Sequence, residues 1–597
     1  MAELNTGQDV MNLYNKATDA WSAAVTQSEK TMRYLNHLQH TDKDLKNAEA
    51  FDTALLTLNI MQPAVSVLLG NEQQNSRRGK IKPRGNPESA AILQGRWNML
   101  NDEQGIEEKL QTVFVDGLGK RVGGWIERKF VMTADGYLDY QYEVSNGFNI
   151  KLDPETTTDD YKLAKCRWLT KDTWMVMDEI IDVYGARPDF QEEKKVSFID
   201  KITNYVKSLT DSAYSSSEFY DKENDTYKVI ELQKRVGTKY VRFYDTTTGE
   251  YHVLPDVDWK KLKNPTLTKV LETIEKRIHI TTVIPFFGNL VVQDELAKWP
   301  APNFSLFPFW SFEYNVKAFE AACMLDLLVD VQDVMNKTES FEMDHLVKVV
   351  AGATFVHEKD EDTYKALKEE GNQPHQVHKY KNENRRPFKL PPDQLPQGAL
   401  LNQQNAMNRV ADITLIDNAI KGGGGKSGES ASLFEQKVER AAAAINSYFA
   451  NLSKSRKFLL EDFVDNASYV YAEADRYIDV KNDGEYERVL INLATAAGTL
   501  NSVINPSVFV ELDEGQDNAT YKEDNFNSMA AMVNIIAQYN PNLVDWPAYI
   551  GASPIDEAKP MQDYAVAQLE TQQANEAADR AMAEQEGVTN LVKGAQP

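Results

Sequence analysis

Cysteine and long apolar runs are both scarce in this chain of 597 residues. Its two cysteines, Cys166 and Cys323, lie too far apart in sequence to suggest a disulfide framework, so we expect a reducing compartment. The longest apolar stretch, residues 54–69, is interrupted by Asn59 and Pro63 and is too short and too polar to span a bilayer. The sequence begins without the basic and apolar segments of a signal peptide. These absences predict a soluble protein with no membrane partner.

An excess of positive charge is also missing. The chain has 65 Lys and Arg residues against 90 Asp and Glu, for a net charge of −25. Proteins that grip nucleic acid usually carry a basic face, so this balance argues against tight binding of DNA but not against DNA passing nearby. With a hydrophobic fraction of 42% the chain can build large cores. Its length allows about four domains of ~150 residues each.

Catalytic signatures are absent as well. The glycine run 422–425 resembles a phosphate-binding loop, but the first glycine of the Walker A spacing would fall on Ile420, and no strand pattern precedes the run. His375 and His378 have no cysteine or carboxylate pattern that would complete a zinc site. We therefore expect no enzyme, no cofactor and no metal, since an ATPase or a nuclease would need the missing motifs. What remains is a mobile loop with a cation at each end, made of Lys421, Gly422, Gly423, Gly424, Gly425 and Lys426.

The first 310 residues predict a mixed body of helices and strands. Apolar residues at three- and four-residue steps predict helices over residues 7–76, 87–114, 173–184 and 196–209. Pro63 is expected to kink or divide the second helix within residues 7–76. The basic piece 77–83 is typical of a strand.

Two patches in this body have the alternating pattern of strands. Residues 124–152 predict a three-stranded antiparallel meander, with turns at Asp135-Gly136 and Asn146-Gly147. Residues 226–254 predict two strands that pair around Gly237 and a third that follows a turn at Thr248-Gly249. The whole pattern predicts an α+β fold.

A long helix is expected next. Residues 313–350 contain no glycine and no proline, which favours a continuous helix of roughly 38 residues and about 57 Å. One side of it is apolar, and the other carries acidic residues that include Asp326, Asp330 and Asp333. This acidic side is either a solvated face of a core helix or an electronegative wall facing a partner.

Residues 351–396 form a compact segment bounded by glycine and proline. It carries a basic cluster that is unusual in so acidic a chain, and the cluster either steers an acidic partner or only aids solubility. Its members are Lys379, Lys381, Arg385, Arg386 and Lys389. Beyond it, helices are predicted at 399–419, 430–465, 525–539 and 560–590, and strands at 477–480 and 508–512.

This order of elements, together with short segments spread over the chain, resembles the portal proteins of tailed double-stranded DNA phages, most of all those of short-tailed, podovirus-type phages. None of the segments is a catalytic signature, and their order carries the resemblance. They are NIMQPAVSVLLGNE at 59–72, the KIKP strand, DGLGK at 116–120, LDP at 152–154, LFPFWSFEY at 306–314, VQDVMNK at 331–337, the glycine loop with SGESASLF, and FVELDEG at 509–515.

The resemblance implies a ring of typically twelve subunits at one capsid vertex of the virion, assembled in the host cytoplasm, that conducts DNA during genome packaging and ejection. Implied partners are the large terminase motor, the major capsid protein and scaffold, a tail adaptor protein, and double-stranded DNA passing without sequence preference. The implied parts are a wing at 1–310 and 431–515, stem helices at 311–350 and 397–419, a clip at 351–396, a tunnel loop at 420–430 and a crown at 516–597. Another structural ring or tail connector of a virion is the alternative.

Elementary electrostatics fits such a conduit. Each cation that neutralises a DNA phosphate adds affinity, so a channel that lets DNA slide should be mostly acidic. We therefore expect Asp326, Asp330 and Asp333 to keep the bore electronegative. The mobile Lys421 and Lys426 would make only brief contacts with the phosphates. The basic cluster of the clip would dock the motor and the adaptor.

Overall fold

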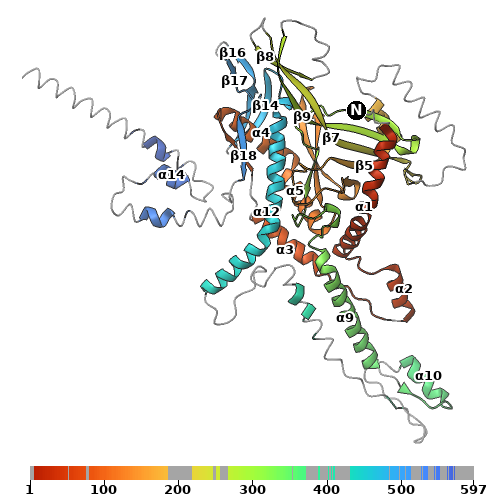
Figure 1. Cartoon of the computed structure of the whole chain (residues 1–597). Coiled ribbons are helices and arrows are strands. Elements are labelled where there is room, and N and C mark those ends of the chain that lie inside the picture. The colour runs from red at the N-terminus through yellow and green to blue at the C-terminus, as the bar shows by residue number, and fades with distance from the viewer. Residues whose placement is uncertain are drawn as a thin grey trace, which may run out of the picture. The chain divides into compact units, whose positions relative to one another are not determined.

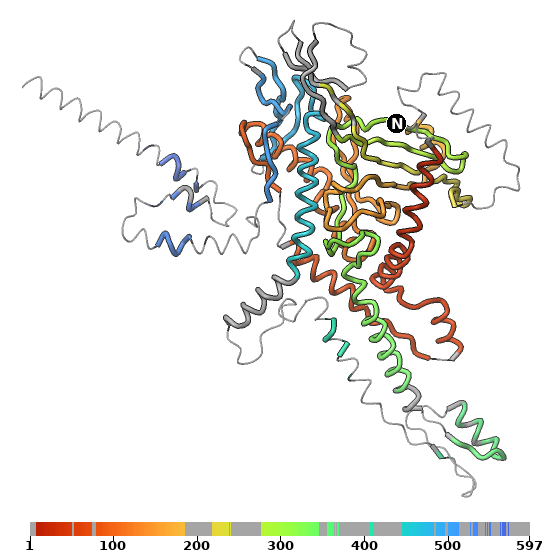
Figure 2. Tube along the Cα trace, viewed as in Figure 1, coloured from red at the N-terminus to blue at the C-terminus, as the bar shows by residue number. Residues whose placement is uncertain are grey.

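The computed structural model divides the chain into two compact units, one formed by residues 1–69 and 81–511 and the other by residues 70–80 and 512–597. The structure describes residues 6–51, 53–74, 79–185, 218–245, 250–255, 267–351, 354–370, 388–389, 401, 405–406, 408–410, 431–482, 485–495, 498–504, 506–512, 526, 529–534, 544, 546–551, 561–562, 564–568 and 571 (Figures 1 and 2). The first unit contains the sheets and the long helices.

Three helices open the chain: α1 (Thr6–Leu35), α2 (Asp42–Phe51) and α3 (Met61–Gln74). Pro63 does not kink a helix as expected. It lies in the first turn of α3, where a backbone N–H has no partner within the helix and its loss costs nothing. Strand β1 (Gly79–Pro83) follows.

The helix expected at 87–114 is two helices, α4 (Pro87–Gln104) and α5 (Ile106–Gly119). Gly105 separates them with φ +59°, a left-handed conformation that glycine adopts at little cost, and its N–H donates to the carbonyl of Asn101.

A three-stranded sheet has the order β11-β2-β3, with β2 (Gly124–Met132), β3 (Leu138–Ser145) and β11 (Leu306–Phe309) all antiparallel. The first predicted turn is confirmed, because Gly136 has φ +81° and the N–H of Thr133 donates to Tyr137. The predicted third strand of the meander is wrong: β4 (Ile150–Leu152) pairs with β5 in another sheet. The side chain of Asn146 caps a 3-10 turn (Gly147–Asn149) that redirects the chain.

The larger sheet has the order β10-β9-β7-β5-β4, with β6 and β8 also on β7. Its strands are β5 (Trp168–Val176), β6 (Tyr220–Asp221), β7 (Thr226–Asp245), β8 (Glu250–Pro255), β9 (Leu267–Ile284) and β10 (Leu290–Leu296). The predicted pairing around Gly237 is wrong. Gly237 lies inside the 20-residue strand β7, opposite Lys276, because β9 pairs along nearly the whole of β7. The third strand of that patch is present as β8.

The helix predicted at 173–184 is only partly present. Residues up to Val176 continue β5, and the chain then forms the short α6 (Met177–Ile180) and a π-helical turn (Ile181–Gly185). The β5 residues stay extended because they pair with β7, from Trp168↔Lys234 to Val176↔Thr226. The helix predicted at 196–209 lies outside the described residues.

The predicted helix at 313–350 is shorter than expected: α9 covers Asp326–Ala351, 26 residues. Among the preceding residues, 314–318 pair with the segment 156–159, and a 3-10 turn (Ala318–Glu320) follows. The N–H of Thr158 donates to Val316 and that of Asp159 to Tyr314, which satisfies backbone groups that a helix would otherwise use. Glu313 is fixed to Lys454 (Oε2–Nζ, 2.5 Å). A lack of glycine and proline therefore did not make this stretch helical.

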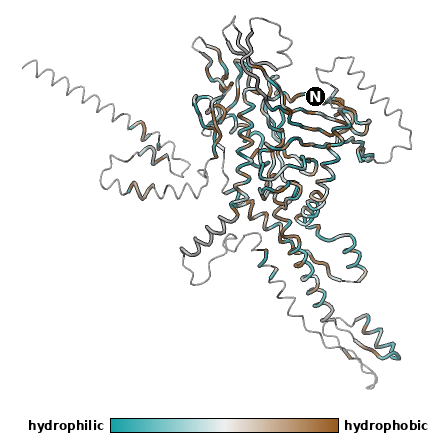
Figure 3. The backbone as a smooth tube through the Cα atoms, viewed as in Figure 1, coloured by the Kyte–Doolittle hydropathy of each residue, from teal (hydrophilic) through white to brown (hydrophobic). Residues whose placement is uncertain are grey.

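Helix α12 (Ala431–Val470) extends slightly past the predicted helix at 430–465. Its buried residues, among them Tyr448, Leu452 and Phe463, join one large core with α4, α5 and the three-stranded sheet. A second large core lies between α1 and the larger sheet and contains Trp21, Trp125 and Trp310. Figure 3 shows apolar segments in this body and a hydrophilic α10 (Glu361–Glu370).

The two predicted strands near the end of this unit are confirmed, as β14 (Arg476–Asn482) and β18 (Val508–Leu512). Strand β15 (Glu485–Ile491) pairs with β14, and β16 (Leu493–Thr495) pairs with β17 (Gly498–Leu500). Beyond α9 the short strands β12 (Thr354–Phe355) and β13 (Phe388–Lys389) pair with each other. In the second unit α14 (Trp546–Gly551) is described, and the helices predicted at 525–539 and 560–590 lie mostly outside the described residues.

Candidate functional site at helix α9

Most of the predicted site residues fall outside the described part of the chain. This applies to the whole tunnel loop 420–430, to most of the second stem segment 397–419, and to Lys379, Lys381, Arg385 and Arg386. Lys389 is described as the end of β13, where its backbone pairs with Thr354. The predictions for these residues stay predictions. The three acidic residues of α9 are all described.

The three acids do not share one environment. Asp326 is the first residue of α9, and its carboxylate accepts from the guanidinium of Arg121 (Oδ2–Nε, 2.6 Å) and from the N–H of Cys323 at 3.0 Å. Its side chain is only 5% exposed, so its charge is neutralised inside the subunit. Asp333 accepts from the hydroxyl of Tyr34 at 2.6 Å. Asp330 is exposed.

Tyr34 belongs to α1 and Arg121 to the turn after α5, roughly 200 to 300 residues away in sequence. Burial is the main cause that raises the pKa of the Tyr34 hydroxyl, and the hydrogen bond to Asp333 raises it further. The hydroxyl therefore remains a donor at neutral pH. The composition of one helix face could not reveal that two of its acids serve to hold the helix to its own subunit.

An extended segment, residues 53–60, is hydrogen-bonded to α9 along a line of side chains that we call the polar ladder. Alternate backbone N–H groups of the segment donate to side-chain oxygens four residues apart on the helix. The pairs are Leu56 to Ser340 (2.8 Å), Leu58 to Asn336 (3.0 Å) and Ile60 to Gln332 (2.9 Å). Two residues of an extended chain advance about 6.6–6.8 Å and four helical residues about 6 Å, so the two spacings match.

The ladder is buried and continues into neighbouring elements. Gln332 and Asn336 are almost fully buried, and the amide of Gln332 also donates to Leu58 O at 2.6 Å. Asn336 donates to the side chain of Gln39, which in turn donates to Tyr34 O at 3.0 Å. A buried amide is costly unless it is hydrogen-bonded, so these contacts specify one position of α9 against the body.

Asn59 joins the ends of two helices beside the ladder. Its Nδ2 donates to the carbonyl of Leu35 at 2.9 Å, at the end of α1. Its Oδ1 accepts from the N–H groups of Met61 and Gln62 at 3.0 and 3.2 Å, at the start of α3. One side chain therefore contributes a cap to both helices, although α2 lies between them in the sequence.

A cavity of about 450 Å³ lies between α2, the segment 53–60 and α9. Its lining is mixed in charge and includes His40, Asp44, Asp333 and Lys337. Both acids already accept hydrogen bonds, Asp333 from Tyr34 and Asp44 from Thr41, and the latter lowers the pKa of Asp44. The lining gives no set of convergent groups of one kind that would select a ligand.

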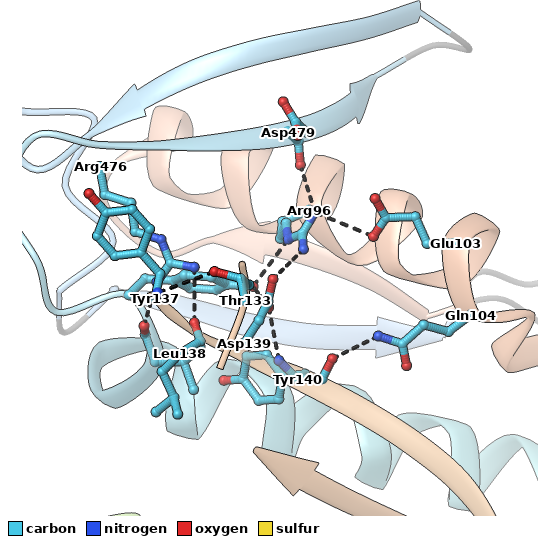
Figure 4. Close-up of polar contacts among 12 residues, drawn as sticks. Arg96, Glu103, Gln104, Thr133, Tyr137, Leu138, Asp139, Tyr140, Arg476 and Asp479 are labelled. Carbon is cyan, nitrogen blue, oxygen red and sulfur yellow. Dashed lines mark hydrogen bonds and ion pairs between the residues drawn. The ribbon is translucent and has the colours of Figure 1, made fainter. Parts of the chain in front are cut away.

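A cluster of buried polar residues in the body fixes α4 against β3 and β14 (Figure 4). Arg96 pairs with Asp139 at 2.5 Å and donates to the carbonyl of Asp479 at 3.1 Å. The hydroxyl of Tyr471 donates to Asp139 at 3.1 Å, and burial raises its pKa. Nearby, Arg476 donates to the carbonyl of Leu138 at 2.9 Å. Arg96, Asp139 and Tyr471 are hydrogen-bonded to one another and hold together segments distant in sequence, which is a structural arrangement.

A second ion pair is completely buried. Arg128 on β2 and Asp462 on α12 meet at 2.6 Å, and both side chains are 0% exposed. The guanidinium carbon of Arg128 lies 4.7 Å from the centres of the Phe130 and Trp299 rings. Burial raises the pKa of Asp462, and the nearby guanidinium opposes that shift. This pair fastens the long helix to the three-stranded sheet.

Within the described ranges, no three His, Cys, Asp or Glu side chains are grouped so that they could hold a metal ion. No helix in the same part of the chain has the length and apolar content to cross a membrane.

Residues 11–595, nearly the whole chain, match the family model described as "Phage P22-like portal protein". A search of curated proteins gave no match.

Proposed function

Because the chain belongs to the phage P22-like portal protein family, we propose that copies of it close into a ring of twelve subunits through which the genome passes. Portal proteins are structural proteins of the virion that act in capsid assembly, genome packaging and ejection, and this is the function of the chain. The ring would sit at one capsid vertex, after assembly in the host cytoplasm.

One observation supports the assignment of α9 as the first stem helix. The helix leaves the sheets of its unit, with α10 near its far end (Figures 1 and 2). The chain then returns beside it: Ala406 and Val410 pack against Val331 and Met335 of α9. An outgoing helix with a returning segment alongside fits a stem that connects a wing to a clip.

The channel wall would be acidic overall, in keeping with the net charge of −25. Of the three acids expected to line it, we now assign this role to Asp330, since Asp326 and Asp333 are engaged with Arg121 and Tyr34. Repulsion between this wall and DNA phosphates would keep the duplex from adhering. The loop 420–430, with Lys421 and Lys426, would approach the DNA most closely.

The remaining partners are assigned to other parts of the chain. The basic cluster between Lys379 and Lys389 is proposed to dock the large terminase motor and later the tail adaptor, because a cationic patch steers acidic partners. The major capsid protein and scaffold would contact the ring from the capsid side. Residues 516–597 would form the crown.

A packaging assay tests this function. Procapsids assembled with the chain, and matched procapsids assembled without it, are supplied with motor, ATP and genomic DNA, and DNA protected from nuclease is measured. We expect protected DNA only where the chain is present. Equal protection in both preparations would contradict a portal role.

A further inference from the structure

Two sheet edges in this body are closed by side chains from neighbouring helices. The first is the edge of β3. Gln104 of α4 donates to the carbonyl of Tyr140 at 2.7 Å and accepts from the N–H of Tyr142 at 2.9 Å. Lys109 of α5 donates to the carbonyl of Tyr142 at 2.7 Å. These side chains occupy backbone groups that an added strand would need.

The second closed edge belongs to β14. Arg96 donates to the carbonyl of Asp479 at 3.1 Å (Figure 4), and Asn98 donates to that of Lys481 at 3.2 Å. Both donors lie on α4. Helices α4 and α5 therefore protect the edges that they pass, and an edge without such cover calls for an explanation.

The opposite edge of the same two-stranded sheet, along β15, is open. In an antiparallel pair, residues opposite each other either bond to each other or both face away. Because the backbone of Asp479 and Lys481 faces α4, that of their partners Arg488 and Tyr486 faces outward from the sheet. Among the described residues, these outward backbone groups have no hydrogen-bond partner. The open part ends at Leu490, whose carbonyl accepts from a side-chain amide at 2.9 Å.

The side chains along this open edge differ between the two faces of the strand. Glu485 and Glu487 are exposed on one face, and neither forms an ion pair with another residue in the described ranges. Tyr486, which is 66% exposed, and Arg488 lie on the other face. Arg488 already has an acidic neighbour, since its Nε lies 3.7 Å from Asp479 Oδ1. The edge therefore offers two unpaired carboxylates on one face and an exposed aromatic ring on the other.

We propose that β15 is a docking edge for an extended segment of a partner protein, with lysine or arginine at alternate positions and apolar residues between them. The backbone of the segment would pair with the outward groups of Tyr486 and Arg488, as in other cases of strand addition. Its cations would then lie beside Glu485 and Glu487, and its apolar side chains beside the ring of Tyr486. This interaction surface is independent of the proposed ring and of its channel.

The same carboxylates exclude other occupants. Antiparallel pairing with a second copy of β15, centred on Tyr486 or on Glu487, would place a glutamate of one copy beside a glutamate of the other, and like charges in that position are destabilising. DNA phosphates would be repelled in the same way. Charges on an edge strand commonly protect it from unwanted pairing. Here they are of one sign on one face, so they still admit a basic strand.

The test measures binding of fluorescent peptides to the full chain by anisotropy. The probe is acetyl-KVKVKVK-amide. One control peptide has glutamate in place of every lysine, and the other is N-methylated at every valine, which removes the N–H groups that would bond to β15. We expect the lysine peptide to bind saturably and at least about tenfold more tightly than either control. Amide hydrogen exchange in residues 485–490 should become slower when it is bound.

Two variants of the chain locate the contact. Glu485→Lys combined with Glu487→Lys should weaken binding of the lysine peptide at least about tenfold. The matched control, Asp19→Lys with Glu29→Lys, makes the same change of charge at exposed positions of α1 and should leave binding unchanged.

The second variant, Arg488→Pro, removes an outward N–H that does not bond to β14, and it should also weaken binding. Circular dichroism and thermal unfolding check that each variant is folded. A lysine peptide that does not bind the wild-type chain, or that binds the charge-reversed chain equally well, would overturn the proposal. Equal binding of the N-methylated peptide would overturn it too, because charge alone would then explain the contact.

Discussion

At the scale of single residues, Asn59 shows how much one side chain can decide. Its amide caps the end of α1 and the start of α3 at once, through contacts with Leu35 O, Met61 N and Gln62 N. Asparagine at this position is visible in the sequence, but its role is not, since nothing in the sequence tells which helix ends its side chain would meet.

Replacing this side chain should therefore destabilise the protein. We expect Asn59→Ala to lower the free energy of unfolding by about 1–2 kcal/mol, because a lost cap leaves backbone groups of both helices without partners. Urea unfolding followed by circular dichroism measures this. Asn47→Ala, in the exposed helix α2, serves as control and should change stability little. A loss in the control as large as that of Asn59→Ala would refute the capping role.

The buried pair of Arg128 and Asp462 gives a larger effect. Asp462→Ala leaves the guanidinium buried without its carboxylate, and such a loss typically costs about 3–5 kcal/mol. Changing Arg128 to Met as well removes the unpaired charge and should recover part of the stability. As comparison, Asp479→Ala breaks a surface pair with Arg488 and should cost less than about 1 kcal/mol. Equal losses for the two aspartates would show that burial does not set the energy of the first pair.

At the scale of elements, sequence patterns found what is local and missed what depends on distant partners. Strands β14 and β18 and helix α12 were predicted close to their observed bounds, because alternation and helical spacing identify such elements. The segment before α9 and the residues around Gly237 were misassigned. In both cases pairing with a distant strand or segment satisfies the backbone and overrides local preference.

The polar ladder was missed for the same reason. Gln332, Asn336 and Ser340 stand at four-residue intervals, but nothing in the sequence tells which backbone their oxygens would meet. Likewise, Asp326, Asp330 and Asp333 looked equivalent as members of one acidic face. Their different environments follow from Arg121 and Tyr34, which only the folded chain brings near.

The ladder predicts a local change in dynamics. Asn336→Leu removes the acceptor of the Leu58 N–H and the donor to Gln39, each a buried group that costs about 1–3 kcal/mol when unsatisfied. We expect amide hydrogen exchange in residues 53–60 to become roughly ten- to a hundredfold faster. The exposed neighbour Lys337→Leu is the control and should leave this exchange unchanged. Unaltered exchange in Asn336→Leu would mean that the ladder does not hold the segment to α9.

At the scale of the whole molecule, the resemblance inferred from ordered sequence segments agrees with the family match over residues 11–595. The acidic net charge fits a protein that guides DNA without binding it tightly. The assembly, with its subunit number and its channel, forms only from many copies of the chain. A single chain shows only the exposed surfaces and the net charge from which such an assembly would form.

The most direct test of the account is an electron cryo-microscopy reconstruction of the purified, assembled chain. We predict a closed ring of twelve subunits in which α9 of every copy surrounds an axial channel. The Cα atoms of Gly422 to Gly425 should be among those closest to the axis. Open filaments or isolated dimers would contradict it, as would a ring in which α9 or these glycines face the outer rim.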